Sequence, residues 1–307
     1  MIPLEARIAK ELRAPVAKPA REAARRLAAM AKGGAVGVLF YGSGFRAGTL
    51  EGVLDFYVLV DRMKDWPSGH FVAWAGHELP PNVEYREFPD LGVRAKVAII
   101  ELAAFSDRVW TYSLDTTLWA RFAQPCALAA VRDQTARKAI EQAVGQAVAT
   151  AAGWAAALGP TQGKANDYWL ALFAATYAAE LRVEKTARSG TILEHAEERY
   201  AALLTEAWDA QGLGYDKKKG LLTPRLTEAE RRRALGDWRL RRWLGKPLNM
   251  ARLAKACFTF EGAADYIVWK VERHTGVKLP LTPWRRKHPL LSAPWALWRL
   301  WRAGVVR

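Results

Sequence analysis

The chain has 307 residues with a formal net charge of +15, and 51% of its residues are hydrophobic. This length fits two domains or one large one, with enough apolar residues for a buried core. No uncharged apolar run reaches the about 18 residues of a membrane-spanning helix, and the positive charge favours anionic partners, namely nucleotides, nucleic acid or an acidic membrane surface.

The first 32 residues are rich in alanine and arginine and predict an amphipathic helix. Its expected buried positions are Ile8, Leu12, Val16 and Leu27. The arginines also suit a mitochondrial targeting segment, but this stretch contains three glutamates, and such segments are poor in acidic residues. We therefore favour an ordinary first helix over a targeting segment.

Residues 35–104 alternate short apolar runs with turn signals, which is typical of mixed α/β structure. Strands are predicted at Val36–Tyr41, Leu54–Val60 and Val93–Ile100, and a helix is predicted at Ala103–Gln124. The pattern of Trp66–Trp74 does not decide between helix and strand.

From Arg132 onward nearly every segment predicts a helix. The expected helices are Gln134–Leu158, Lys164–Thr186, Glu194–Gln211, Met250–Thr275 and one opened by a capping box at Thr227 and Glu230. Lys217–Gly220 is expected to be a solvated loop. The expected fold class is therefore α+β, with a mixed sheet and helices in residues 1–130, a mostly helical domain in 131–280 and an amphipathic tail in 281–307.

The stretch from Val36 to Val60 carries the strongest chemical signal. An apolar strand ends in Gly42-Ser43-Gly44, where glycine lets the backbone approach a phosphate that amide N–H groups and the serine hydroxyl can hold. On the next strand, Asp55 can hold the magnesium that accompanies a nucleoside triphosphate. This layout indicates nucleotidyl transfer, with an ordinary turn and an ordinary strand carboxylate as the alternative.

The period of a strand places Asp55, Tyr57 and Asp61 on one face. Two carboxylates two residues apart could share a metal ion, but the second of these positions is Tyr57 here. Asp61 lies about 20 Å from Asp55 along a straight strand. We predict Asp55 and Asp61 as catalytic residues and metal ligands, and a bend or bulge is needed for them to share an ion.

Two cations near this stretch are candidates for phosphate binding. Lys96 lies in a predicted strand among apolar residues, where an unpaired charge would be costly. It could contact a triphosphate or pair with Asp55; alternatively, its strand lies at a sheet edge and the lysine reaches water. Arg46 follows the Gly-Ser turn and is a candidate phosphate clamp.

Tyr41-Gly-Ser-Gly44, followed by Leu54-Asp-Phe and Val60-Asp61, resembles the mitochondrial translocator-assembly-and-maintenance family. Members of that family are CDP-diacylglycerol synthases with a polymerase-beta-like nucleotidyltransferase domain. The resemblance extends, with gaps, over about residues 35 to 200, through Val93–Ile99, Leu118–Pro125 and Tyr177–Lys185. The departures are Lys96-Val-Ala-Ile in place of the family's Lys-Tyr-Gly-Val and Ala120-Arg-Phe in place of its Gly-Arg-Leu.

The resemblance implies Mg²⁺-dependent transfer of CMP from CTP to phosphatidic acid, which gives CDP-diacylglycerol and pyrophosphate. It implies that Asp55 holds the metal, that Asp61 stands where the family also has an acid, and that Lys96 matches a family lysine. The residues that would contact nucleotide or phosphate are Gly42, Ser43, Gly44, Arg46, Arg121, Arg182 and Lys185.

The partners implied are CTP, phosphatidic acid and an anionic membrane surface, and nucleic acid is not expected. The implied location is the cytoplasmic side of a bacterial inner membrane or, alternatively, the matrix side of a mitochondrial inner membrane. Two other functions stay open. One is nucleotidyl transfer to nucleic acid or protein, and the other is a non-catalytic nucleotide- or lipid-binding relative that lost the second metal ligand at Tyr57.

The last segment of the chain is rich in tryptophan and arginine. A helix with Pro294 in its first turn would gather Trp295, Trp298 and Trp301 on one side, with Arg299 away from them and Arg302 at the boundary. This pattern favours a helix lying in the plane of an anionic bilayer. The alternative is that the tryptophans pack on the protein core.

A second basic block is expected to be a solvated helix face, with lipid headgroups or nucleic acid as alternative partners. It consists of Arg231–Arg233, Arg239, Arg241, Arg242 and Lys246. Two nearby tryptophans, Trp238 and Trp243, do not decide between these partners.

Overall fold

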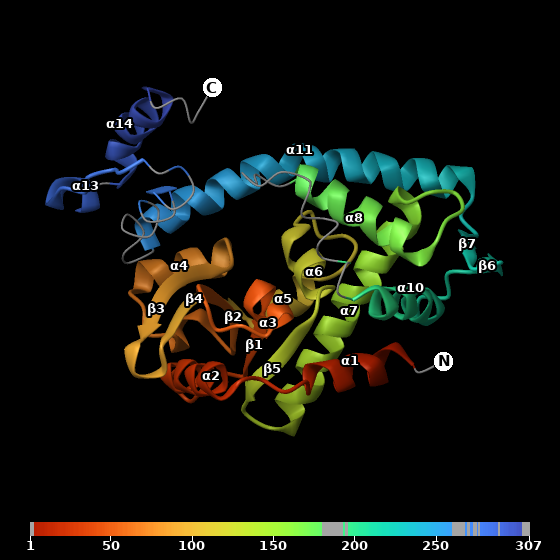
Figure 1. The fold of residues 1–307 in the computed structure, drawn as a ribbon, viewed down its shortest axis with the longest axis horizontal. Coiled ribbons are helices and arrows are strands. Elements are labelled where there is room, and N and C mark those ends of the chain that lie inside the picture. Colours follow the sequence, from red (N-terminus) through yellow and green to blue (C-terminus); the bar gives the residue numbers. More distant parts are fainter. Residues whose placement is uncertain are drawn as a thin grey trace.

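The computed structural model describes residues 3–179, 193, 196–259, 268, 271–272, 275, 277–287 and 289–302. Over these residues the protein is α+β, with a mixed five-stranded sheet, a small two-stranded sheet and many helices (Figure 1). Within the same residues, every helix is too short or too polar to cross a bilayer.

The large sheet has the strand order β3-β4-β2-β1-β5, in which β2 and β4 are parallel and the other neighbours are antiparallel. Its strands are β1 Gly37–Tyr41, β2 Val53–Val60, β3 Asn82–Phe88, β4 Val93–Glu101 and β5 Cys126–Val131. The central strands are mostly apolar because both faces of the sheet are covered.

The three predicted strands are confirmed to within one residue at each end. The two strands at the sheet edges, β3 and β5, were not predicted. Edge strand β3 mixes charged and apolar residues, and β5 is alanine-rich, so neither has the continuous branched apolar run of a central strand.

The predicted helix Ala103–Gln124 is wrong in its middle. Two short helices occur instead, α5 Leu102–Arg108 and α6 Thr117–Phe122. Between them, the Asp115 carboxylate accepts hydrogen bonds from the backbone N–H and the hydroxyl of Thr117, at 3.0 and 2.5 Å. Such a local bond offers the backbone an alternative to continuing a helix. In the ambiguous stretch, α4 occupies His70–Glu78.

The first 32 residues form two helices rather than one, α1 Leu4–Leu12 and α2 Lys18–Met30. Ile8 and Leu12 are buried in the same cluster as Tyr57, whereas Leu27 is buried with Phe56, so the two helices serve opposite faces of the sheet. Pro15 and Pro19 explain the separation, because proline lacks the N–H needed inside a helix.

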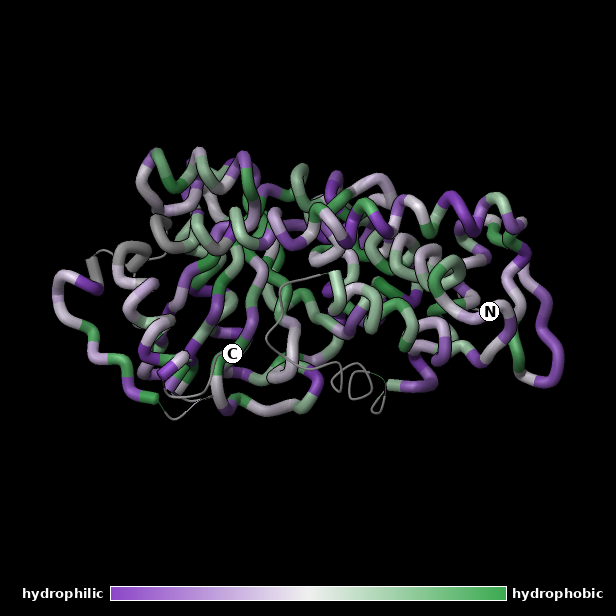
Figure 2. Tube along the Cα trace, turned by 90° about the horizontal axis from the view of Figure 1, so that it is seen from above, coloured by the Kyte–Doolittle hydropathy of each residue, from purple (hydrophilic) through white to green (hydrophobic). Residues whose placement is uncertain are grey.

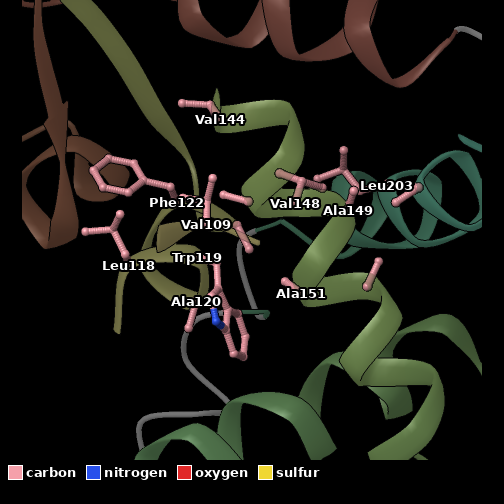
Figure 3. Packing of buried hydrophobic residues seen from close by; sticks show 14 of the residues in the cluster. Val109, Leu118, Trp119, Ala120, Phe122, Val144, Val148, Ala149, Ala151 and Leu203 are labelled. Carbon is pink, nitrogen blue, oxygen red and sulfur yellow. The ribbon is translucent and has the colours of Figure 1, made fainter. Parts of the chain in front are cut away.

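The helical half packs directly onto the sheet face that contains Tyr57. It comprises α7 Gln134–Leu158, α8 Ala165–Ala179, α10 Glu197–Ala210 and the long α11 Glu228–Thr259. Figure 3 shows Trp119 and Phe122 of α6 facing α7, whose buried side chains there include Val144, Val148 and Ala151. One buried cluster thus runs from the sheet into the helices, and the division at residues 130 and 280 stays a prediction.

The capping box that opens α11 is confirmed. The Thr227 N–H donates to the Glu230 carboxylate at 2.8 Å, and the Glu230 N–H donates to the Thr227 hydroxyl at 3.2 Å. The predicted solvated loop Lys217–Gly220 is exposed throughout, but only Lys219 and Gly220 form a turn, because Lys217 and Lys218 belong to β6 Tyr215–Lys218, which pairs with β7 Leu221–Pro224. The tip of this hairpin is hydrophilic (Figure 2). Two further helices follow, α13 Pro283–Lys287 and α14 Pro289–Arg302.

Candidate functional site

One row of side chains crosses the sheet on the face that packs against α6 and α7. Strand register aligns Tyr85, Lys96, Asp55, Tyr41 and Cys126, in that order from β3 to β5. Asp55 and Lys96 are half-buried, and they are the charged members of an otherwise neutral row. Burial raises the pKa of the Cys126 thiol to about 12, so this cysteine is not a thiolate nucleophile at neutral pH.

The Gly42-Ser43-Gly44 segment is the first turn of a six-residue helix, α3 Gly42–Ala47, rather than an isolated turn. Gly42 has φ +86°, and a Cβ placed there would lie 2.6 Å from Oδ2 of Asp55. Ser43 is exposed, whereas Gly44 is buried and a Cβ there would lie 2.8 Å from Cδ2 of Leu54. Gly42 therefore brings the backbone directly against the Asp55 carboxylate, and Gly44 is required by packing.

In a protein that transfers nucleotides, as the sequence predicts, Gly42→Ala is expected to lower nucleotide binding and turnover, because the added methyl group would collide with the carboxylate of Asp55. Gly48→Ala is the matched control, since Gly48 also has positive φ (+63°) but its Cβ would have no atom within 4 Å. Both changes should cost about 1–2 kcal/mol of stability through the left-handed backbone. Equal loss of nucleotide affinity in the two variants, measured by titration, would contradict a role of Gly42 in the site.

Arg121 of α6 lies over the two tyrosines next to Asp55. Its Nη1 donates a hydrogen bond of 3.3 Å to the Tyr57 hydroxyl, and its guanidinium carbon is 5.6 and 5.8 Å from the ring centres of Tyr41 and Tyr57. Such cation–π contacts hold a guanidinium in place. Burial raises the pKa of Tyr57, although the nearby arginine charges lower it in part. Tyr57 is thus a neutral phenol that positions Arg121.

The other predicted cations differ in where the structure places them. Lys96 lies on β4 directly opposite Asp55 in the strand register. Arg46, one helical turn after Gly42, donates a hydrogen bond of 2.9 Å to the side chain of Gln124 just after α6. Arg182 and Lys185 lie outside the described residues. Asp55, Lys96, Arg46 and Arg121 therefore lie on β2, β4, α3 and α6.

Asp61 does not join this site. Strand β2 pairs without a bulge from Asp55 to the end of the strand, so the two carboxylates stay at opposite ends, about 20 Å apart. Asp61 is exposed and forms an ion pair of 2.5 Å with Arg132. The bend or bulge that the two carboxylates would need in order to share a metal ion is therefore not present in β2.

Asp55 alone can be tested as a magnesium ligand. No group of three His, Cys, Asp or Glu side chains in the described part of the chain could hold a metal ion. Mg²⁺ is commonly held by one or two carboxylates together with substrate phosphates and water. A single half-buried carboxylate therefore fits only an ion that takes its other ligands from the phosphates of a bound triphosphate and from water.

The sequence interpretation missed a second group of polar residues behind Tyr57. Arg252 of α11 donates to the Asp115 carboxylate at 2.5 Å and to the carbonyl oxygen of Pro80 at 3.1 Å. Burial alone would raise the pKa of Asp115, but the Arg252 charge and hydrogen bonds from Arg252 and Thr117 hold it below its usual value. This pair fastens α11 to the α5–α6 connection beside the site.

Lys255, one turn further along α11, strengthens the same attachment. Its Nζ donates to the carbonyl oxygens of Leu79 and Pro81 at 2.6 and 2.7 Å and to the Asn82 side chain at 3.0 Å. Burial, followed by the charges of Arg252 and Arg108, lowers the pKa of Lys255 to about 8. Trp238, Arg241, Arg252 and Lys255 follow one another at steps of 3, 11 and 3 residues, which places them on one helix face, and this spacing was the available sequence signal.

Arg241 corrects the prediction of a uniformly solvated basic block. It is buried, donates to the carbonyl oxygens of Thr111 and Ser113, and lies 4.5 Å from the ring centre of Trp154. Trp238 is also buried, against Trp119 and Trp154. Arg231 is half-buried and donates to the carbonyl oxygen of Gly159. The rest of the block is exposed, as predicted, namely Arg232, Arg233, Arg239, Arg242 and Lys246.

The tail helix begins at Pro289, so the prediction that Pro294 lies in its first turn is wrong. Trp298 and Trp301 are 50% and 62% exposed, and Arg299 and Arg302 are also exposed. Trp295 is half-buried, with the guanidinium carbons of Arg285 and Arg299 at 3.5 and 5.6 Å from its ring centre. Two of the three predicted membrane tryptophans are therefore available to a partner.

No model of a known protein family matches the chain, and a search of curated proteins finds no relative.

Proposed function

We propose that the protein is a magnesium-dependent, membrane-associated cytidylyltransferase that transfers CMP from CTP to phosphatidic acid. The observation that carries this proposal is the contact of the Gly42 backbone with the Asp55 carboxylate, next to Lys96 on the neighbouring strand. The two substrates come from the resemblance to CDP-diacylglycerol synthases.

In this reaction a phosphate oxygen of phosphatidic acid attacks the α-phosphorus of CTP. A new P–O bond forms there, and the bond to the leaving pyrophosphate breaks. The attacking phosphate is ionised at neutral pH, so the reaction requires no general base. We assign the binding of the incoming and leaving phosphates to Lys96, Arg46 and Arg121, and Tyr57 keeps Arg121 in position.

Magnesium, when bound, neutralises charge on the phosphates, and Asp55 would be its protein carboxylate. Ser43 is exposed and lies just after the C-terminal end of β1, next to Gly42, where its hydroxyl can contact phosphate. Arg182 and Lys185 remain candidate phosphate contacts on the basis of the resemblance.

A non-catalytic nucleotide-binding protein is the second candidate. It is favoured by Tyr57, which occupies the place of a second carboxylate and is buried and neutral. Such a protein would bind CTP without turnover.

The deciding experiment incubates purified protein with CTP, Mg²⁺ and phosphatidic acid in detergent micelles and measures both pyrophosphate and the lipid product. Thermal shift with CTP, ATP, GTP and UTP is measured in parallel, because a ligand at 100 times its Kd stabilises the native state by about 2.7 kcal/mol. A CTP-specific shift without product would favour the second candidate. Activity towards RNA or protein but not towards phosphatidic acid would overturn the proposed acceptor.

A further inference from the structure

The long helix α11 has two faces of different character. Residues at alternating steps of three and four face the rest of the protein, and they are Trp238, Arg241, Gly245, Leu248, Arg252 and Lys255. A Cβ on Gly245 would lie 2.6 Å from the carbonyl oxygen of Ala179, so this face packs closely on α8. The orientation of α11 is thus fixed by buried contacts, which also fixes what its other face presents.

The outer face of α11 exposes large apolar side chains. Trp243 is 74% exposed, Met250 is 62% exposed and Leu240 is 49% exposed. Their spacing of three and seven residues places them in one stripe along the helix. Exposed large apolar side chains on one side of a helix whose other side is packed are the pattern of a surface with a partner.

Exposed cations border this stripe. Arg239, Arg242 and Lys246 are all exposed, and the sequence contains no acidic residue between Asp237 and Glu261. An apolar centre with basic flanks matches a bilayer, which offers acyl chains beneath a layer of anionic headgroups. A nucleic acid would match the cations but not the aliphatic side chains of Leu240 and Met250. A second copy of this chain would be repelled by the net charge of +15.

We propose that the outer face of α11, formed by Leu240, Trp243 and Met250 with Arg239, Arg242 and Lys246, lies on an anionic bilayer. In Figure 1, α11 runs along one edge of the molecule and α14 lies beyond its C-terminal end, on the side away from the sheet. The exposed tryptophans of α14 then form a second contact with the same bilayer. The choice of a lipid partner rests on the proposed function, whereas vesicle binding can be measured without any enzyme activity.

The test measures co-sedimentation of the full chain with vesicles of phosphatidylcholine and phosphatidylglycerol, without CTP. Trp243→Ser combined with Met250→Ser should weaken partitioning about tenfold or more, because the apolar area no longer enters the bilayer. Trp74→Ser is the matched control, since Trp74 is 59% exposed on α4, beneath α11, and its loss should have little effect.

A charge pair separates local contact from general attraction. Arg239→Glu with Arg242→Glu should weaken binding about thirtyfold or more, at roughly 1 kcal/mol per lost cation. Lys217→Glu with Lys218→Glu changes the net charge equally but at the exposed β6 strand, and should weaken binding much less. Equal effects of the two pairs, or wild-type binding by the Trp243 and Met250 variant, would overturn the proposal. The proposal would also be overturned if the Arg239 and Arg242 variant lost binding to RNA while its binding to vesicles stayed unchanged.

Failure of this proposal is distinguishable from failure of the proposed function. Asp55→Asn should bind vesicles as the wild type does, whatever its activity. If the protein transfers CMP in micelles but its α11 variants bind vesicles normally, the proposed α11 surface is wrong and the proposed enzyme activity stands. If vesicle binding depends on α11 but the protein does not transfer CMP, the α11 surface stands and the proposed enzyme activity is wrong.

Discussion

Asp55→Asn is expected to reduce CMP transfer about 10²–10³-fold, because it removes the carboxylate that would hold magnesium against the triphosphate. The change is nearly isosteric, so thermal stability should hardly move. Initial rates of pyrophosphate release with CTP and phosphatidic acid measure the effect.

Asp61→Asn is the matched control for that result. Asp61 lies on the same strand but at its other end, exposed and paired with Arg132, so its loss should leave the rate within about twofold of the wild type. Equal losses from Asp55→Asn and Asp61→Asn would show that both carboxylates act in one centre. Full activity of Asp55→Asn would overturn the proposed function itself.

Arg252→Ala is expected to lower the free energy of unfolding by about 3–5 kcal/mol, because it leaves the buried Asp115 carboxylate without its cation. The shift of the urea midpoint measures this loss. Arg242→Ala, on the exposed side of the same helix, should change the midpoint little. Replacing Arg252 and Asp115 together by leucine should recover much of the loss, since no unpaired charge then remains.

The same pair predicts a dependence on pH. The pKa of Asp115 is below its usual value in the folded protein, so the pair stabilises the fold fully above the ordinary carboxyl pKa of about 4. This contribution is lost as the pH falls through the lowered pKa. The Arg252 and Asp115 double leucine variant should therefore lose less stability than the wild type as the pH falls below about 4. Identical acid dependence of the two proteins would contradict this assignment.

The site was predictable from sequence only where local pattern decides position. Asp55 was identified by its place on the strand after the Gly-Ser turn, and Lys96 because it interrupts an apolar strand. Their strands proved to be neighbours in register. The same reasoning failed for Asp61, since the side-chain period gives the face but not the distance along the strand. Tyr57 was treated as a missing ligand, and its hydrogen bond to Arg121 depends on where α6 packs.

Packing likewise decided which cations are exposed. Arg241 and Arg242 are adjacent in sequence, yet one is buried on backbone carbonyls and the other is exposed. The sequence of a basic run therefore shows its charge, but which of its side chains face solvent depends on how its helix packs. The attachment of Arg252 to Asp115, 137 residues apart in the chain, is likewise invisible in local pattern.

The sequence by itself determined the three central strands, the opening of α11 at its capping box, the placement of Asp55 and the excess of positive charge. Each of these depends on side-chain period, on a short-range hydrogen bond or on composition, and all of them act within a few residues. Only the tertiary structure decided that Gly42 lies against Asp55, that Asp61 is remote, and that α11 presents tryptophan and arginine outward. Those outcomes depend on how strands pair and which helix face is buried, because contacts between distant segments select one arrangement among many that the same local pattern allows.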